Sequence, residues 1–96
     1  MEKEPCIICK REALFIFIRA DYYEYRCENC GKYFFSNGLN KLDYENKEKL
    51  DEKGREKISK FIREYNKATE ERAKLGDLET LWKEIEDFNR TRQRER

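Results

Sequence analysis

Four cysteines in the first 30 residues constrain this chain more than any other feature of its sequence. They form two close pairs, Cys6 with Cys9 and Cys27 with Cys30, in the pattern C-x₂-C-x₁₇-C-x₂-C. Two residues between the members of a pair let a tight turn bring both sulfurs to one metal ion. Two such turns complete a tetrahedron of thiolates, so the spacing predicts one structural Zn²⁺ held by these four cysteines.

The two pairs are followed by different residues. Gly31 comes after the second pair and can take the left-handed conformation that such a turn uses. Lys10 stands at the equivalent place after the first pair, where these turns often have glycine.

Other roles of the cysteines remain open, namely a pair of disulfides, a redox role or a rubredoxin-like iron site. The N-terminal segment Met1-Glu2-Lys3-Glu4-Pro5 lacks the basic and then apolar layout of a secretion signal. We therefore expect a cytoplasmic protein, in which paired cysteines indicate a metal before disulfides. Four sulfur ligands also leave no open position for water, which argues against zinc catalysis.

The composition explains why a metal site would be needed to stabilise the fold. Of the 96 residues, 45% are charged and 38% are hydrophobic. A chain of this length buries only about 60–65% of the surface that its unfolded form exposes. A single core is then hardly sufficient, and we expect a metal, a partner or both to supplement it. No run of apolar residues approaches the length of a membrane span, so no membrane association is expected.

The 17 residues between the cysteine pairs predict a β-hairpin. Residues 13–18 are an apolar run rich in aromatic and β-branched side chains, and residues 22–26 return to deliver Cys27. Arg19-Ala20-Asp21 is the predicted turn. Residues 32–36 predict a third short strand, which Asn37-Gly38 would end.

The second half of the chain changes to helical periodicity. Asp43 could cap a first helical stretch that runs to about Lys53 and that Gly54 interrupts or ends. From Arg55 an apolar stripe follows at helical spacing, with a stop at Gly76 and an N-cap for the last helix at Asp77. The stripe consists of Ile58, Phe61, Ile62 and Tyr65, weakly extended by Ala68, Ala73 and Leu75.

Together these patterns predict a small α+β fold. It would consist of a four-cysteine zinc ribbon, built from a β-hairpin plus a third short strand, followed by two or three α-helices. We assign residues 1–38 to the ribbon and residues 39–96 to a helical extension that packs on it and ends in a basic tail.

With these motifs in place, the chain resembles the N-terminal zinc-ribbon-plus-helix module of uncharacterised prokaryotic proteins, several of them linked to antiviral defence. That module has the form C-x-x-C…C-x-x-C-G-x-Y/F, followed by a helix with a Leu/Ile-Ser-x-aromatic-Ile-Arg signature. The matching residues are Cys6, Cys9, Cys27, Cys30, Gly31 and Tyr33 in the ribbon and Ile58, Ser59, Phe61, Ile62 and Arg63 in the helix. In such proteins the module usually precedes a larger effector domain. This chain stops after one more helix, so the resemblance implies an adaptor, a regulator or a mimic that blocks a longer relative.

A protein-binding role is the first function that we expect. The chain has no histidine, no phosphate-binding loop and no base beside its serines, so we expect a non-enzymatic module. It would regulate, adapt or inhibit a larger prokaryotic complex of defence or counter-defence, and it could also form a homodimer. The candidate partner-binding face is an amphipathic stripe with the only tryptophan; its alternative is packing against the other helix and the ribbon. This stripe consists of Leu78, Leu81, Trp82, Ile85 and Phe88.

The alternative function is nucleic-acid binding, as in transcription-associated zinc ribbons. Aromatic side chains of the ribbon could stack on bases, and a basic tail could bind phosphates. These residues are Tyr22, Tyr23 and Tyr25, together with Tyr33, and Arg90, Arg92, Arg94 and Arg96. The tyrosines could equally pack within the fold, and the arginines could simply suit the C-terminal end of a helix. The formal net charge of +1 falls to −1 with four thiolates and one Zn²⁺, which favours the protein-binding role.

Overall fold

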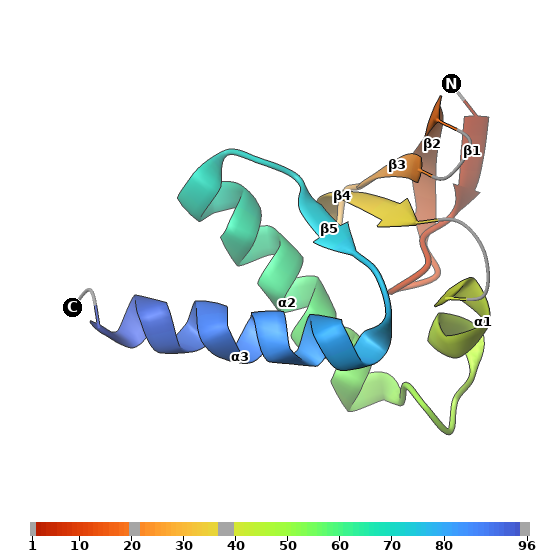
Figure 1. The fold of residues 1–96 in the computed structure, drawn as a ribbon. Helices are drawn as coiled ribbons and strands as arrows, with labels where there is room; N and C mark the ends of the chain where they lie inside the picture. The colour runs from red at the N-terminus through yellow and green to blue at the C-terminus, as the bar shows by residue number, and fades with distance from the viewer. Residues whose placement is uncertain (1, 20–21, 37–39, 95–96) are drawn as a thin grey trace.

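The computed structural model describes residues 2–19, 22–36 and 40–94, which form one sheet and three helices (Figure 1). The elements follow the chain in the order β1 (Glu2–Pro5), β2 (Glu12–Arg19), β3 (Tyr22–Cys27), β4 (Gly31–Ser36), α1 (Asn40–Glu45), α2 (Glu52–Thr69), β5 (Ala73–Leu75) and α3 (Leu78–Arg94). The small α+β fold, with a four-cysteine ribbon followed by helices, is thus confirmed. The predicted turns at residues 20–21 and 37–38 lie outside the described residues.

The strands lie in the order β1-β2-β3-β4-β5, which follows their order along the chain. β1 to β4 are antiparallel neighbours, whereas β5 pairs with β4 in parallel. One face of the sheet is apolar and buried because side chains alternate along each strand. On this inner face Tyr25 stacks on Tyr33 with ring centroids 5.2 Å apart, and Phe35 and Leu75 continue the buried surface.

The helix α2 covers the inner face of the sheet. Its apolar positions Ile58, Phe61 and Ile62 are buried, as their helical spacing predicts. The side chain of Asp51 caps the helix by accepting the Gly54 N–H at 2.8 Å. The prediction that Gly54 interrupts a helix was therefore wrong. Gly54 lies in the first turn of α2, where a side chain would crowd Leu50.

The segment after α2 was also predicted wrongly. The helix ends at Thr69, and Glu70 takes a left-handed conformation with φ of 60°. Ala73 and Leu75, expected as a weak continuation of the helical stripe, instead form β5 with both side chains buried. Their i, i+2 spacing suits a strand, and the free edge of β4 supplies the hydrogen-bonding partner. The sheet thus takes its fifth strand from the half assigned to the helical extension.

The first helical stretch is shorter than the sequence suggested. α1 ends at Glu45, well before Lys53, and a non-helical connection leads to Asp51. Tyr44 is buried, packs edge-on against Phe35 and donates a hydrogen bond of 2.8 Å to the carbonyl oxygen of Gly76. Within the part of the chain that the structure describes, no helix has the length and apolar character needed to cross a membrane.

Candidate metal centre

Two turns present the four cysteines. The first turn follows β1 and is closed by a hydrogen bond of 3.0 Å from the Lys10 N–H to the carbonyl oxygen of Cys6. Lys10 itself has φ of 69°, so it adopts the left-handed conformation that glycine usually provides. The second turn links β3 to β4, and its Cys30 N–H donates to the sulfur of Cys27 at 3.4 Å.

Gly31 is required by the second turn. Its φ is 111°, and a Cβ at this position would collide with the side-chain oxygen of Asn66. That oxygen accepts the Lys32 N–H at 2.8 Å, and the Asn66 amide donates to the Lys32 carbonyl oxygen at 3.1 Å. The second turn is therefore held closely against α2.

The four sulfur atoms form one compact cluster in which all of them lie within 4.8 Å of one another. The Cys6 and Cys30 sulfurs are 3.8 Å apart, and the Cys9 and Cys27 sulfurs are 3.5 Å apart. Four ligands at about 2.3 Å from one ion would be about 3.8 Å from each other. The cluster therefore fits a tetrahedral metal site, and the separations are much longer than the roughly 2.05 Å of a disulfide.

The cysteines differ in exposure. Cys6 and Cys30 are fully buried, Cys27 is 5% exposed, and Cys9 is half-buried. A hollow of about 900 Å³ lies beside Cys9, between the first turn and α2. Among the four candidate ligands, Cys9 is thus the corner that solvent reaches most easily.

Tyr33 supplies a hydrogen bond to one buried sulfur. Its hydroxyl lies 3.2 Å from the Cys6 sulfur and also 3.2 Å from the Ile7 amide nitrogen. The amide can only donate, so the tyrosine oxygen accepts from Ile7. The phenolic hydrogen is then available to the Cys6 thiolate.

Helix α2 supplies a hydrogen bond to the other buried sulfur. The Ser59 hydroxyl donates to the Cys30 sulfur at 3.2 Å, and the Arg63 guanidinium donates to the Ser59 oxygen at 2.7 Å. Arg63 also donates to the carbonyl oxygen of Asn29 in the second turn at 2.9 Å. Two turns of helix before Arg63, Arg55 donates to the carbonyl oxygens of Ile7 and Ile8 in the first turn, at 3.0 and 3.1 Å.

Without a cation, the protein groups around the cluster do not stabilise all four cysteines as thiolates at the same time. Proton sharing with Cys30, aided by Tyr33, lowers the pKa of the Cys6 thiol to about 4. Burial raises the pKa of Cys27 to about 11, and the hydrogen bond to Cys6 together with burial raises the pKa of Cys30. A cation would make all four thiolates favourable, because metal binding displaces thiol protons. An all-sulfur tetrahedral set suits Zn²⁺ or iron and leaves no position for a substrate.

The supporting residues around the sulfurs were not recognised from the sequence in this role. Ser59 and Arg63 appeared there only as matches to the resembled module, and Tyr33 as such a match and as a possible stacking tyrosine. A signal was nevertheless present, because Arg55, Ser59 and Arg63 are spaced by four residues on one helix. We call these three residues the polar stripe of α2.

The structure places the ribbon tyrosines largely inside the fold. Tyr25 and Tyr33 are buried, and the half-buried Tyr23 packs against Phe15 with ring centroids 4.9 Å apart. An exposed stacking platform of tyrosines is thus not formed by Tyr25 and Tyr33. The side chain of Tyr22 lies outside the described set.

The basic tail is described only at its start. Arg90 is exposed and pairs with Glu86 at 3.2 Å and with Asp87 at 3.6 Å, both on its own helix. The backbone of α3 includes Arg92 and Arg94, whose side chains, like the whole of Arg96, lie outside the described residues.

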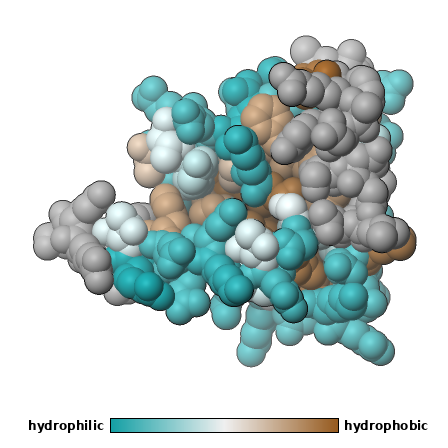
Figure 2. Space-filling model, in the orientation of Figure 1, coloured by the Kyte–Doolittle hydropathy of each residue, from teal (hydrophilic) through white to brown (hydrophobic). Residues whose placement is uncertain are grey.

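The stripe with the only tryptophan faces the interior. Leu81 is 1% exposed, Leu78 and Ile85 are 8% exposed, and Trp82 and Phe88 are half-buried against the core. Phe88 packs on Phe61 with ring centroids 5.4 Å apart. In this structure the stripe therefore packs on the chain's own core, and its three aliphatic members are not exposed to a partner. Figure 2 shows hydrophilic residues over α3, with hydrophobic side chains visible in the seam above it.

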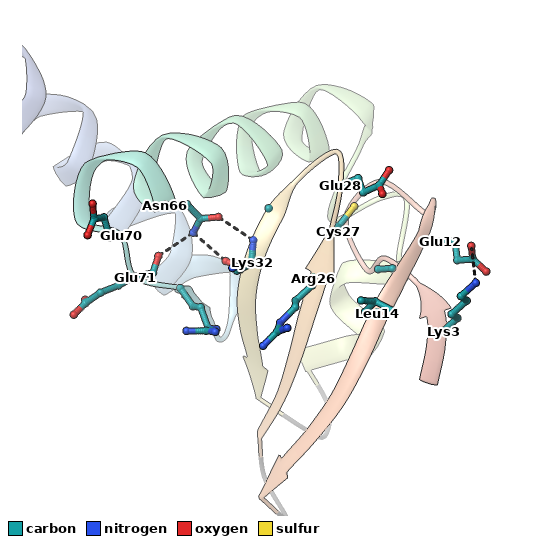
Figure 3. A pocket seen from close by; sticks show the side chains of 13 residues that line it. Lys3, Glu12, Leu14, Arg26, Cys27, Glu28, Lys32, Asn66, Glu70 and Glu71 are labelled. Carbon is teal, nitrogen blue, oxygen red and sulfur yellow. Dashed lines mark hydrogen bonds and ion pairs between the residues drawn. The ribbon is translucent and has the colours of Figure 1, made fainter. Parts of the chain in front are cut away.

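The outer face of the sheet carries a buried ion-pair network. Glu24 is only 4% exposed, and Arg26 donates to its carboxylate at 2.7 Å while Arg72 pairs with the other oxygen. A hollow of about 890 Å³ lies beside it (Figure 3), where Leu14 and Arg26 project from the strands. On the same outer face of the sheet, Ile18 is 46% exposed and Phe34 is half-buried, so this face is partly apolar.

Comparisons of this chain with protein-family models, with curated proteins and with solved structures found no match.

Proposed function

We propose that this chain is a non-enzymatic module in which Cys6, Cys9, Cys27 and Cys30 hold one structural Zn²⁺. The observation that carries the proposal is the single cluster of four sulfurs within 4.8 Å, with separations that suit a tetrahedron. When bound, the ion would hold the two turns together and supply folding free energy. All four ligand positions come from protein, so substrate activation at the ion is not expected. We also propose a cytoplasmic location, because thiolates that hold a metal ion suit a reducing compartment.

The metal content of the purified protein tests this part. We expect one zinc per chain by elemental mass spectrometry, and loss of the metal in Cys6→Ser and Cys27→Ser. One bound iron per chain would identify the rubredoxin-like alternative. A folded protein without metal, carrying two disulfides by intact mass, would contradict the proposal.

We further propose that the module binds a protein and thereby regulates, adapts or inhibits a larger prokaryotic complex. The outer face of the sheet supports this role because it combines exposed Ile18 and half-buried Leu14, Ile16 and Phe34 with the cations Arg26 and Arg72. Such a face suits a partner segment that carries both apolar and acidic side chains. The stripe around Trp82 is less suited, since it is already packed.

Substitutions on two exposed apolar residues test this face. We expect Ile18→Glu to abolish capture of a partner, whereas Leu42→Glu should retain it. Leu42 is the matched control because it is 63% exposed but lies on α1. A partner that binds both variants equally would contradict the assignment of the outer face.

Nucleic-acid binding is the second candidate, and one observation favours it. The strand register places Lys3, Leu14, Arg26 and Lys32 in a cross-strand row, so three cations lie on one face. Binding through these cations should weaken with salt. The logarithm of the binding constant should fall against the logarithm of the salt concentration with a slope of about 0.7–0.9 per phosphate contact. Lys32→Gln should reduce that slope, whereas Lys57→Gln on α2 should not. Affinity that does not change with salt would exclude this candidate.

A further inference from the structure

We infer that Ser59 and Arg63 are positioning residues of the metal centre, through which α2 controls how firmly the metal is held. This inference rests on the metal site of the proposed function. It concerns the shell around the sulfurs rather than the four ligands themselves.

The polar stripe of α2 contacts both cysteine turns. Arg55 binds carbonyl oxygens of the first turn and Arg63 binds a carbonyl oxygen of the second turn. Ser59 lies between them on the helix, is 6% exposed and contacts the Cys30 sulfur. Because these residues recur every four positions, a single helix face reaches both turns and one ligand.

The direction of the hydrogen bonds is fixed by chemistry. A guanidinium has no acceptor, so the Ser59 oxygen accepts from Arg63 and its own hydrogen is left for Cys30. The same logic applies at the other buried sulfur, where the Ile7 N–H orients the Tyr33 hydroxyl toward Cys6. Both fully buried sulfurs therefore receive a hydroxyl donor whose orientation is fixed by a second group.

The charges are complementary as well. Four thiolates around a divalent cation carry a net charge of −2, and the stripe brings two guanidiniums to the turns. Hydrogen bonds to a thiolate lower its electron donation to the metal and hold it in place. Removing such supporting partners typically costs about 10–100-fold in metal affinity. We therefore expect Ser59 and Arg63 to slow metal release without contacting the ion.

Cobalt-loaded and zinc-loaded proteins test this inference in four variants. Ser59→Ala should release zinc to a chelator about 10–100-fold faster than wild type. It should also move the sulfur-to-cobalt charge-transfer band to lower energy, because the Cys30 thiolate becomes a stronger donor. Ser59→Thr retains a hydroxyl and should restore both properties. Arg63→Met should change both in the direction of Ser59→Ala, whereas Lys60→Met, a neighbouring charge on the same helix, should match wild type.

The outcomes separate the inference from the proposed function. A wild-type protein that binds no metal would overturn both. If wild type binds one zinc and folded Ser59→Ala keeps the wild-type band and release rate, the inference alone is overturned. Should Ser59→Ala not fold, Arg63→Met decides, because Arg63 is exposed and its loss leaves no cavity in the core.

Discussion

The hydroxyl of Tyr33 and the sulfur of Cys6 lie 3.2 Å apart, and both residues are completely buried. This contact joins the inner face of the sheet to the cluster of four cysteines, since the ring of Tyr33 also stacks on Tyr25. The aromatic layer and the cysteine cluster are thus parts of one structure, and each should respond to changes in the other.

Removal of the Tyr33 hydroxyl tests that connection. Tyr33→Phe leaves the ring in place but deprives the Ile7 N–H and the Cys6 sulfur of their partner. We expect the free energy of unfolding to fall by about 1–3 kcal/mol, measured by denaturant titration of the metal-loaded protein. Tyr65→Phe is the control and should have a smaller effect, because Tyr65 is half-buried where it packs on Phe61. Equal losses in the two variants would show that the Tyr33 hydroxyl contributes no more to stability than the Tyr65 hydroxyl does.

Gly31 should tolerate no side chain. Gly31→Ala would force a φ of 111° on alanine and drive its Cβ into the side chain of Asn66. We expect the unfolding free energy to fall by about 1–3 kcal/mol and metal binding to weaken. Gly76→Ala is the matched control, because no atom lies within 4 Å of an added Cβ there. A Gly31→Ala protein as stable as the control would contradict the strained turn.

The free energy of unfolding should fall at high pH because the hydroxyl of Tyr25 is buried. Burial raises the pKa of its hydroxyl from an ordinary value of 10 to about 12. Below pH 10 the tyrosine is protonated in both states, so the full stability is present. Between pH 10 and 12 the unfolded state loses the proton first, and unfolding is favoured by up to about 3 kcal/mol. Denaturant titrations from pH 9 to 11.5 should show this loss of unfolding free energy, and the loss should be smaller in Tyr25→Phe. If the unfolding free energy of Tyr25→Phe falls with pH as steeply as that of wild type, Tyr25 is excluded as the source.

Removal of the metal should unfold the ribbon. Structural zinc contributes an apparent free energy of about 10–16 kcal/mol in small domains, which is as large as the whole stability of a typical protein. Adding a chelator should therefore abolish β-structure by circular dichroism and change the fluorescence of half-buried Trp82. A chelated protein with an unchanged spectrum would show that the core is sufficient on its own.

Before that unfolding, the cysteines should react in a definite order. Cys9 is half-buried beside a hollow, whereas the other three are 0–5% exposed. A thiol-alkylating reagent at low concentration should modify Cys9 first, as peptide mass spectrometry can determine. Initial modification of Cys30, which Ser59 supports, would contradict the order.

The sequence predicted what local spacing determines. The cysteine turns, the hairpin strands and the α2 stripe of Ile58, Phe61 and Ile62 follow from periods of two to four residues. What it missed depends on contacts between distant segments. The strand at Ala73–Leu75 forms because β4 has a free edge, and the tryptophan stripe of α3 could be assigned to core or surface only once α2 was in place.

The surroundings of the cysteines show the same limit. Spacing alone predicted that Cys6, Cys9, Cys27 and Cys30 form one cluster, because a four-cysteine metal site requires this pattern. The four-residue spacing of Arg55, Ser59 and Arg63 indicates a shared helix face, but it does not indicate that the Ser59 hydroxyl points at a sulfur 29 positions earlier in the chain. Tyr25 and Tyr33 were equally ambiguous, since an amphipathic tyrosine suits both a surface and a buried layer.

Because the parallel strand β5 comes last of the strands along the chain, the sheet is completed late in synthesis. Every other strand precedes residue 37, yet β4 gains its last neighbour only when residues 73–75 arrive. A nascent chain that has emerged only to the end of α2 carries an unpaired edge on β4, open to the strands of other chains. Shortened versions of this protein that stop before residue 73 would present the six-residue strand β4 at the sheet edge in place of the three-residue β5, and we expect them to associate edge to edge more readily.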